Sequence, residues 1–212
     1  HSGEWLARAA YSPQSQLRAR IWTWKQSEAV DESFLRGRLA AAIAGRDPLA
    51  RSGEVTAYRE VHAESDGLPG LVVDRYGDFR VVQILSAGAE AWRAPIVDAL
   101  SSGGECVGIV ERSDADVRTL EGLPKRSGPV SGETPPASIV IEEYGLRFGV
   151  DLASGQKTGF YLDQRENRRA VRQLVTAGEV LDGFAYSGGF SVAALRGGAA
   201  RVLAIDNSAS AL

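Results

Sequence analysis

The feature that most constrains the fold is a strand–turn–helix–strand pattern near the end of this 212-residue chain. Residues 179–182 read Glu-Val-Leu-Asp, an apolar strand that stops at a carboxylate. Residues 187–190, Ser-Gly-Gly-Phe, then turn through glycines into a helix over about 189–196. A further strand at 201–205 and a helix start at about 207 complete a β-α-β-α order. This order predicts a parallel sheet with right-handed crossovers, and therefore an α/β fold.

In such a unit a ligand lies at the carboxyl ends of the strands. Asp206 follows Gly188 by eighteen residues (188 to 206), close to the roughly twenty that place a carboxylate on the ribose hydroxyls of a nucleotide. Gly188 and Gly189 let the backbone approach a ligand without a Cβ in the way. The turn has no G-x-G, and Asp182 would repel a pyrophosphate. The pattern therefore favours S-adenosylmethionine, which carries an ammonium and a sulfonium, over a dinucleotide; a glycine turn that binds nothing is the alternative.

Upstream residues predict a smaller α+β region. The expected elements, in chain order, are short strands within 5–24, a helix capped by Asp31 and ended by Gly45 and Pro48, a hairpin of 71–73 and 79–84 about Tyr76-Gly77-Asp78, a helix with Trp92, Ile96, Val97 and Leu100 that stops at Gly103-Gly104, and a strand over 107–110.

The Gly-, Pro- and Ser-rich residues 122–136 predict a linker. A second hairpin about Tyr144-Gly145 is expected after it. Asp163 and Glu166 predict a capping box for a helix over about 164–176.

Composition narrows the class of protein. Hydrophobic residues make up 44% and charged residues 24%, which is typical of a globular chain. The net charge of −3 gives no global signal for nucleic acid. One cysteine and no membrane-length apolar run predict a cytoplasmic protein without a membrane partner. His1 and His62 lie far apart, so no metal site is expected. The chain has no methionine and ends in what reads as the first turn of a helix, which suggests a fragment.

Several segments resemble one known family. They are Gly155–Arg165 (GQKTGFYLDQR), Tyr186–Ser191 (YSGGFS), Tyr58–Val61, Asp66–Asp78 and Gly3–Pro13, spread over nearly the whole chain. They are similar to signature segments of the ribosomal RNA large-subunit methyltransferase I family. The resemblance implies an S-adenosylmethionine-dependent enzyme that forms 5-methylcytosine in 23S rRNA.

The family's architecture implies three regions here: residues 1–24 as the tail of a PUA-like RNA-binding β domain, 25–136 as a central α+β domain, and 137–212 as the opening of a Rossmann-like (class I) methyltransferase domain. The resemblance also implies a cofactor site, in which Asp182, Tyr186, Ser187, Gly188 and Gly189 cradle the methionine part, Asp206 binds the ribose, and Lys157, Thr158, Gly159 and Phe160 close over the cofactor.

The RNA-binding candidates are arginines. Arg18 and Arg20 precede Trp22 and Trp24, and aromatics beside arginines can stack bases and grip phosphates; core aromatics are the alternative. Arg165 and Arg168 belong to a cation-rich stretch over 157–172, for which a solvated face is the alternative. The expected partner is 23S rRNA, and a homodimer is left open.

Catalysis at cytosine C5 needs a thiolate that adds to C6. The only cysteine, Cys106, sits in an apolar strand context and is expected to be a core residue. The sequence therefore assigns no catalytic residue, and the resemblance places the nucleophile beyond Leu212, so the chain as given is expected to bind cofactor weakly or not at all. Two alternatives remain: methylation of another base or position, such as guanine N2, which needs no cysteine, and a non-catalytic RNA-binding module.

Overall fold

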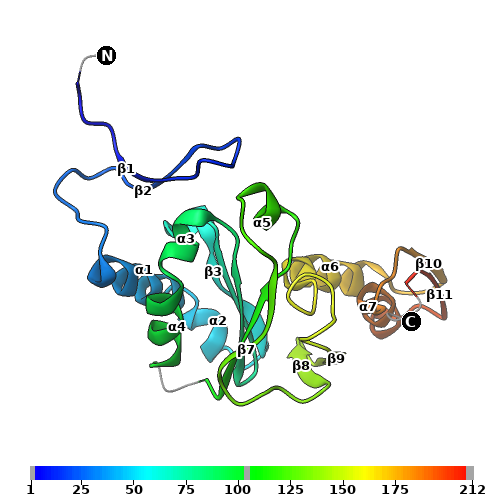
Figure 1. Cartoon of the computed structure of the whole chain (residues 1–212). Coiled ribbons are helices and arrows are strands. Elements are labelled where there is room, and N and C mark those ends of the chain that lie inside the picture. The colour runs from blue at the N-terminus through cyan, green and yellow to red at the C-terminus, as the bar shows by residue number, and fades with distance from the viewer. Residues whose placement is uncertain (1–2, 103–105, 209–212) are drawn as a thin grey trace. The chain divides into compact units, whose positions relative to one another are not determined.

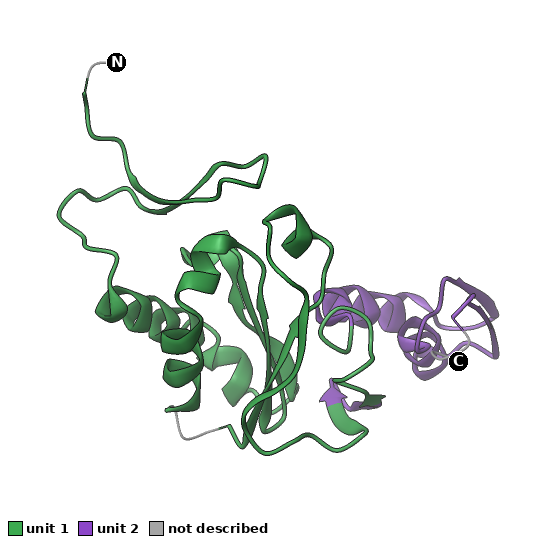
Figure 2. Cartoon of the chain, viewed as in Figure 1, with its two compact units in different colours: residues 1–141, 149–160 green, residues 142–148, 161–212 purple. Residues whose placement is uncertain are grey.

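The computed structural model describes residues 3–102 and 106–208, and the chain divides into two compact units. Unit 1 consists of residues 1–141 and 149–160, and unit 2 of residues 142–148 and 161–212 (Figure 2). The border crosses the hairpin of β8 (Ile139–Glu143) and β9 (Leu146–Val150), whose formation about Tyr144 confirms the predicted turn. This division does not test the predicted domain boundaries after residues 24 and 136, which stay predictions.

Unit 1 is built on a five-stranded sheet in the order β3-β4-β5-β6-β7 (Figure 1). Its pairs are antiparallel except β5–β6, which is parallel. The strands are β3 (Ala57–His62), β4 (Leu71–Tyr76), β5 (Phe79–Ile84), β6 (Gly108–Ser113) and β7 (Arg126–Gly132). The β4–β5 hairpin confirms the turn predicted at Tyr76–Asp78.

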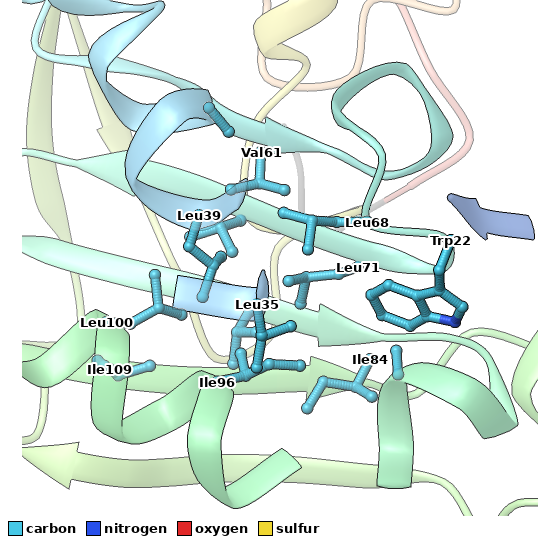
Figure 3. Close-up of a cluster of buried hydrophobic side chains, with 14 residues drawn as sticks. Trp22, Leu35, Leu39, Val61, Leu68, Leu71, Ile84, Ile96, Leu100 and Ile109 are labelled. Atoms are coloured by element: carbon cyan, nitrogen blue, oxygen red, sulfur yellow. The ribbon is translucent and has the colours of Figure 1, made fainter. Parts of the chain in front are cut away.

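One face of this sheet packs against helices (Figure 3). Successive strand residues alternate between the faces, so Leu71 and Val73 share a face, and both are fully buried. Helix α1 (Glu32–Ala44) adds Leu35 and Leu39 to this core, and α4 (Arg93–Ser101) adds Ile96 and Leu100. The other helices of unit 1 are short: α2 (Asp47–Arg51), α3 (Ala87–Ala91) and α5 (Val117–Leu120).

The start of α1 is confirmed, because the Asp31 carboxylate accepts the Phe34 N–H at 2.9 Å and Gly45 caps the end. Pro48, expected to end that helix, lies in the first turn of α2. The helix predicted around Trp92 is interrupted there into α3 and α4. Its expected stop at Gly103-Gly104 lies outside the described residues.

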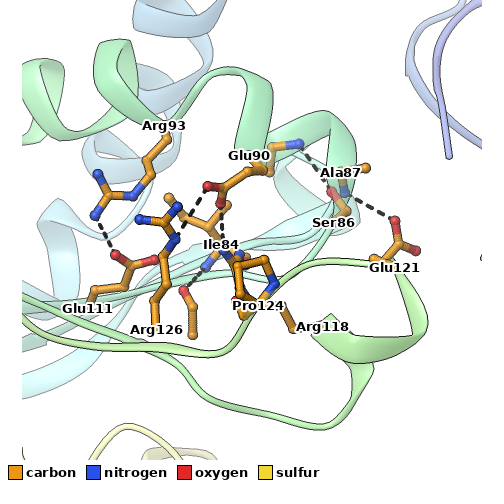
Figure 4. A network of polar contacts seen from close by, with 12 residues as sticks. Ile84, Ser86, Ala87, Glu90, Arg93, Glu111, Arg118, Glu121, Pro124 and Arg126 are labelled. Atoms are coloured by element: carbon orange, nitrogen blue, oxygen red, sulfur yellow. Dashed lines mark hydrogen bonds and ion pairs between the residues drawn. The ribbon is translucent and has the colours of Figure 1, made fainter. Parts of the chain in front are cut away.

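The predicted linker over 122–136 is wrong in part, because it contains β7. Strand propensity did not predict β7, because it contains Gly128, Pro129 and Gly132. However, β7 is the last strand of the sheet, and an edge strand tolerates proline. The segment before it is held by Arg118, whose side chain is fully buried (Figure 4). Its guanidinium donates to the carbonyls of Ile84 and Pro124 and to Glu90 Oε2 at 2.9 Å.

The N-terminal residues form the antiparallel hairpin β1 (Arg8–Tyr11) and β2 (Ala19–Thr23). Trp22 is 4% exposed and belongs to the core of unit 1, whereas Trp24 is 70% exposed. The core alternative therefore holds for Trp22 and not for Trp24.

Unit 2 contains the predicted βαβ pattern: β10 (Glu179–Gly183), α7 (Gly189–Gly197) and β11 (Arg201–Ile205), with β10 and β11 parallel. The helix expected from about residue 207 falls mostly outside the described residues. Helix α6 (Arg165–Leu174) of the same unit precedes this βαβ pattern in the chain and follows a 3₁₀ turn over Leu162–Gln164.

The capping box predicted for α6 is wrong. The residue before the helix is Gln164, which makes no capping side-chain bond. Glu166 instead accepts the Tyr144 hydroxyl at 2.6 Å, because the β8–β9 turn lies against the helix. No described helix is long and apolar enough to cross a membrane.

Candidate cofactor site

The loop between β10 and α7 has an unusual backbone. Phe184, Tyr186 and Gly188 have positive φ angles of 63°, 49° and 72°. For a non-glycine residue this left-handed conformation costs about 1–2 kcal/mol. Two hydrogen bonds hold the loop, Ala185 N–H to the Ile205 carbonyl at 3.1 Å and Gly188 N–H to the Ala185 carbonyl at 2.9 Å. Strain that is maintained in this way is concentrated at functional sites.

Asp206 at the end of β11 fixes this loop. Its Oδ2 accepts the Tyr186 N–H at 2.7 Å, and its Oδ1 accepts the Ser208 N–H at 2.8 Å. These backbone donors, Ser208 first, hold the pKa of Asp206 below its usual value. Each carboxylate oxygen can accept more than one hydrogen bond, so the ionised group can also receive two hydroxyls of a ribose.

Asp182 is the last residue but one of β10 and pairs with Ala204, two residues before Asp206. Its Oδ2 accepts the hydroxyl of Ser191, from the first turn of α7, at 2.6 Å. The two carboxylates therefore stand at the carboxyl ends of neighbouring parallel strands, where an α/β unit holds its ligand.

Gly188 precedes α7 in the left-handed conformation and offers no capping side chain. A Cβ at this position would meet only the Ser191 Cβ, at 3.9 Å. The positive φ angle rather than close packing therefore requires glycine here. The space that a Cβ would occupy is open. The first N–H groups of a helix have no partner within the helix and favour an anion. The α-carboxylate of a methionine moiety suits this end, and its ammonium suits Asp182.

Tyr161 lies beside the predicted site residues Tyr186 and Asp206, although the sequence argument did not single it out. Its ring meets the Tyr186 ring edge to face, with 5.4 Å between centroids. Burial raises the pKa of Tyr161, and the neighbouring Tyr186, Asp163 and Asp206 raise it further. Its position directly after Phe160 in the Gly155–Arg165 segment was the available signal.

The structure brings together the predicted residues of unit 2, which are Asp182, Tyr186, Ser187, Gly188, Gly189 and Asp206. The predicted cover, Lys157 to Phe160, belongs to unit 1. Within it Lys157 is exposed with a φ of 56°, whereas Thr158 is fully buried and Phe160 is 3% exposed. Contact of these residues with the cofactor stays a prediction.

The predicted RNA-binding arginines are mostly engaged in ion pairs. Arg20 contacts Glu64 at 3.1 Å and Glu121 at 3.2 Å, and Arg165 contacts Glu166 at 3.2 Å. Arg18 is exposed and donates to the Pro13 carbonyl.

Arg168 is 2% exposed and binds both carboxylate oxygens of Glu143, at 2.7 and 2.6 Å. Its placement favours a structural role, and the RNA contact stays untested for all four arginines.

Cys106 lies just before β6, half-buried against the core of unit 1, and its thiol donates to the Gly108 carbonyl at 3.0 Å. This placement agrees with the expected core role. Among the described residues no group of three or more His, Cys, Asp or Glu side chains is arranged to hold a metal.

The matches to known proteins fit this site. Residues 125–212 match the family model described as S-adenosylmethionine-dependent methyltransferase. A candidate SAM-dependent methyltransferase from Streptococcus mutans has a TM-score of 0.84 and 27% identity, over 97% of this chain and 53% of that one. A second solved structure, a candidate methyltransferase complexed with SAH, has a TM-score of 0.85 and 27% identity, over 97% of this chain and 52% of its own. The mixed α/β fold and the matched domain are those of the S-adenosylmethionine-dependent methyltransferases.

Curated ribosomal RNA methyltransferases are more similar to this chain in sequence than these solved structures are. Along all 212 residues the chain is 50% identical to the ribosomal RNA large subunit methyltransferase I of Citrobacter koseri and to that of Escherichia coli strain K12. It covers 54% of each of these proteins, so it spans about half their length. The chain is a relative of ribosomal RNA large subunit methyltransferase I.

Proposed function

We propose that the full-length protein transfers a methyl group from S-adenosylmethionine to large-subunit ribosomal RNA, at C5 of a cytosine in 23S rRNA. The observation that carries the proposal is the strained loop between β10 and α7, fixed by Asp206 and flanked by Asp182. The 50% identity to enzymes named ribosomal RNA large subunit methyltransferase I supports the RNA class of substrate.

In this proposal the chain's own residues bind and orient the cofactor, which when bound supplies an electrophilic methyl group on a sulfonium. Asp206 accepts hydrogen bonds from the ribose hydroxyls. Asp182 pairs with the ammonium of the methionine part, and the N-terminus of α7 faces its carboxylate. Tyr161 and Tyr186 form an aromatic wall beside Asp206.

Methylation at C5 requires a nucleophile, because the cytosine ring is not reactive enough unaided. A thiolate adds to C6, C5 then takes the methyl group, and loss of the C5 proton expels the thiolate. Cys106 is bonded to a backbone carbonyl at the core of unit 1 and is not assigned this role. We place the thiolate in the part of the protein beyond Leu212.

In this proposal the N-terminal and central domains bind the RNA. Residues 1–24 are the tail of a PUA-like domain, 25–136 the central domain and 137–212 the start of the methyltransferase domain. The target cytosine is turned out of its helix to reach the methyl donor. In this proposal the protein works in the cytoplasm.

The first test is calorimetry of S-adenosylmethionine binding to the full-length protein. Asp206→Ala should abolish or strongly weaken binding, since it removes the ribose acceptor and the bond to Tyr186. Asp31→Ala is the matched control: it also removes a carboxylate that accepts a backbone N–H, at the start of α1, and should leave the affinity unchanged. No heat from the wild type would refute the enzyme proposal and favour a non-catalytic RNA-binding module.

The second test is mass spectrometry of 23S rRNA from cells with and without the protein. The expected result is loss of one 5-methylcytosine. Loss of a methylated guanine instead would refute the cytosine assignment and leave the methyltransferase class intact.

A further inference from the structure

Helix α6 is anchored to the rest of unit 2 near both of its ends. Close to its start, Arg168 binds both carboxylate oxygens of Glu143 and donates through Nη1 to the Tyr161 carbonyl at 3.0 Å. Close to its end, a Cβ at Gly197 of α7 would lie 2.5 Å from the Arg172 carbonyl oxygen, so the two helices approach closely there. Because all five residues belong to unit 2, α6 has a fixed place within that unit.

Tyr161 lies just before this helix and contacts the loop between β10 and α7. The bond from Arg168 holds its backbone, and its ring meets the Tyr186 ring edge to face, with 5.4 Å between centroids. Burial raises the pKa of Tyr161, and the neighbouring Tyr186 and carboxylates raise it further, so the phenol keeps its proton at neutral pH. A neutral phenol can lie beside the Asp206 carboxylate without charge repulsion.

The backbone of Tyr186 needs support from its surroundings. Its φ angle is 49°, in the left-handed region that is unfavourable for a residue with a Cβ. In this conformation its N–H donates to Asp206 Oδ2 at 2.7 Å. An edge-to-face pair of rings is a favourable arrangement, so the contact with Tyr161 stabilises this conformation from a different element of unit 2.

We infer that Tyr161 is a positioning residue for the cofactor site, because its ring, anchored through α6, holds Tyr186 in the conformation that bonds Asp206. The inference rests on the proposed function, in which Asp206 binds the ribose of S-adenosylmethionine. It gives Tyr161 a role that acts through Tyr186 rather than on the cofactor. A loop that is already in its binding conformation keeps the competent fraction high, and the apparent dissociation constant rises when that fraction falls.

The test compares variants of the full-length protein that remove or keep the Tyr161 ring. Tyr161→Leu removes the aromatic contact, whereas Tyr161→Phe keeps the ring and loses only the hydroxyl. Tyr144→Leu is the matched control, since Tyr144 is also a half-buried tyrosine of unit 2 that packs on α6. Its hydroxyl donates to Glu166 Oε1 at 2.6 Å, and the Arg169 guanidinium lies over its ring.

The first measurement is S-adenosylmethionine affinity by calorimetry. Tyr161→Leu should weaken binding about two- to tenfold, the range that one aromatic pair contributes. Tyr161→Phe and Tyr144→Leu should bind like the wild type. Binding by Tyr161→Leu that is as tight as that of Tyr144→Leu would overturn the inference. Weakened binding by Tyr161→Phe would also overturn it, because the hydroxyl rather than the ring would then carry the effect.

The second measurement is the titration of Asp206 without cofactor, followed by NMR at the Tyr186 amide. The N–H groups of Ser208 and Tyr186 hold the pKa of Asp206 below its usual value. In Tyr161→Leu the Tyr186 bond should form less often, so the midpoint should rise toward the usual value. The midpoint is compared rather than the resonance position, because loss of an aromatic ring changes the shifts of its neighbours directly. Weakened binding with an unchanged midpoint would show that the ring touches the cofactor itself, which overturns the positioning role.

The titration also separates this inference from the proposed function. If the wild type binds no S-adenosylmethionine, the proposed function fails and the midpoints still decide the role of Tyr161. A higher midpoint in Tyr161→Leu than in Tyr161→Phe and Tyr144→Leu would support it. Equal midpoints in all variants would show that the Tyr161 ring does not hold Tyr186 against Asp206.

Discussion

Substitution of Arg168 tests whether this arginine holds unit 2 together. Its guanidinium is buried and bidentate on Glu143, itself 3% exposed, and its Nη1 donates to the Tyr161 carbonyl at 3.0 Å. The contact joins α6 to the β8–β9 hairpin and fixes the backbone of Tyr161, whose ring meets Tyr186.

The cost follows from the charge that is left behind. Arg168→Met retains most of the apolar stem but leaves the Glu143 carboxylate buried without its counter-charge. Loss of one partner of a buried ion pair costs about 3–5 kcal/mol of unfolding free energy. Adding Glu143→Gln removes the uncompensated charge, so the double variant should recover a large part of that loss. The non-additivity measures the coupling of the pair.

The positions of the tryptophans allow the unfolding of the two units to be measured separately. All four tryptophans, Trp5, Trp22, Trp24 and Trp92, lie in unit 1. Tryptophan fluorescence during urea unfolding therefore follows unit 1, while hydrogen exchange of the α6 amides follows unit 2. Arg168→Met should accelerate exchange in α6 by the stated free energy and leave the tryptophan transition in place.

The opposite pattern would refute the reasoning. If Arg168→Met left α6 protection within about 0.5 kcal/mol of the wild type, the range of ordinary surface substitutions, the pair would not stabilise unit 2. A loss of RNA affinity without loss of protection would instead support the RNA contact predicted from the sequence.

Two other predictions concern unit 2. Gly197→Ala should destabilise it by about 1–3 kcal/mol, because a Cβ there would lie 2.5 Å from the Arg172 carbonyl oxygen; hydrogen exchange of α7 measures this, and unchanged protection would contradict the close packing. The lowered pKa of Asp206 predicts a stabilisation that is present above the unfolded value of 3.8 and is lost as pH falls through the lower folded value. The Tyr186 amide resonance, followed by NMR, should shift in that acid range, and in Asp206→Asn it should not.

The sequence predicted local elements well where one segment carries its own signal. The cap at Asp31 and the turn at Tyr76–Asp78 need only neighbouring residues, and both are present. The parallel pairing of β10 with β11 followed from the β-α-β order, since a short helical crossover leaves few other arrangements. The cluster of Asp182, Gly188 and Asp206 followed for the same reason.

The failures share a cause, which is pairing with distant residues. Strand β7 forms although it contains Gly128 and Pro129, because the open edge of β6 offers it hydrogen bonds. The Asp163–Glu166 spacing is that of a capping box, yet Glu166 bonds Tyr144, twenty-two residues away. A local sequence pattern cannot show that a residue distant in sequence will form the hydrogen bond instead of the expected neighbour.

The Gly155–Arg165 segment shows how the same limit acts on function. Read as a string of cation, hydroxyl, glycine and aromatics, it resembles the lining of a ligand site. The Thr158 hydroxyl and the Phe160 N–H donate hydrogen bonds to Asp74 and Tyr76 of β4. A Cβ at Gly159 would lie 2.9 Å from the Val150 side chain. Packing within the protein therefore explains these three residues without a ligand. Lys157 lies exposed at the outside of the loop, with a positive φ angle of 56°. Lys157→Gln removes the positive charge of this exposed side chain, so it should weaken cofactor or RNA binding and leave the melting temperature unchanged. A lower melting temperature would instead show a structural role.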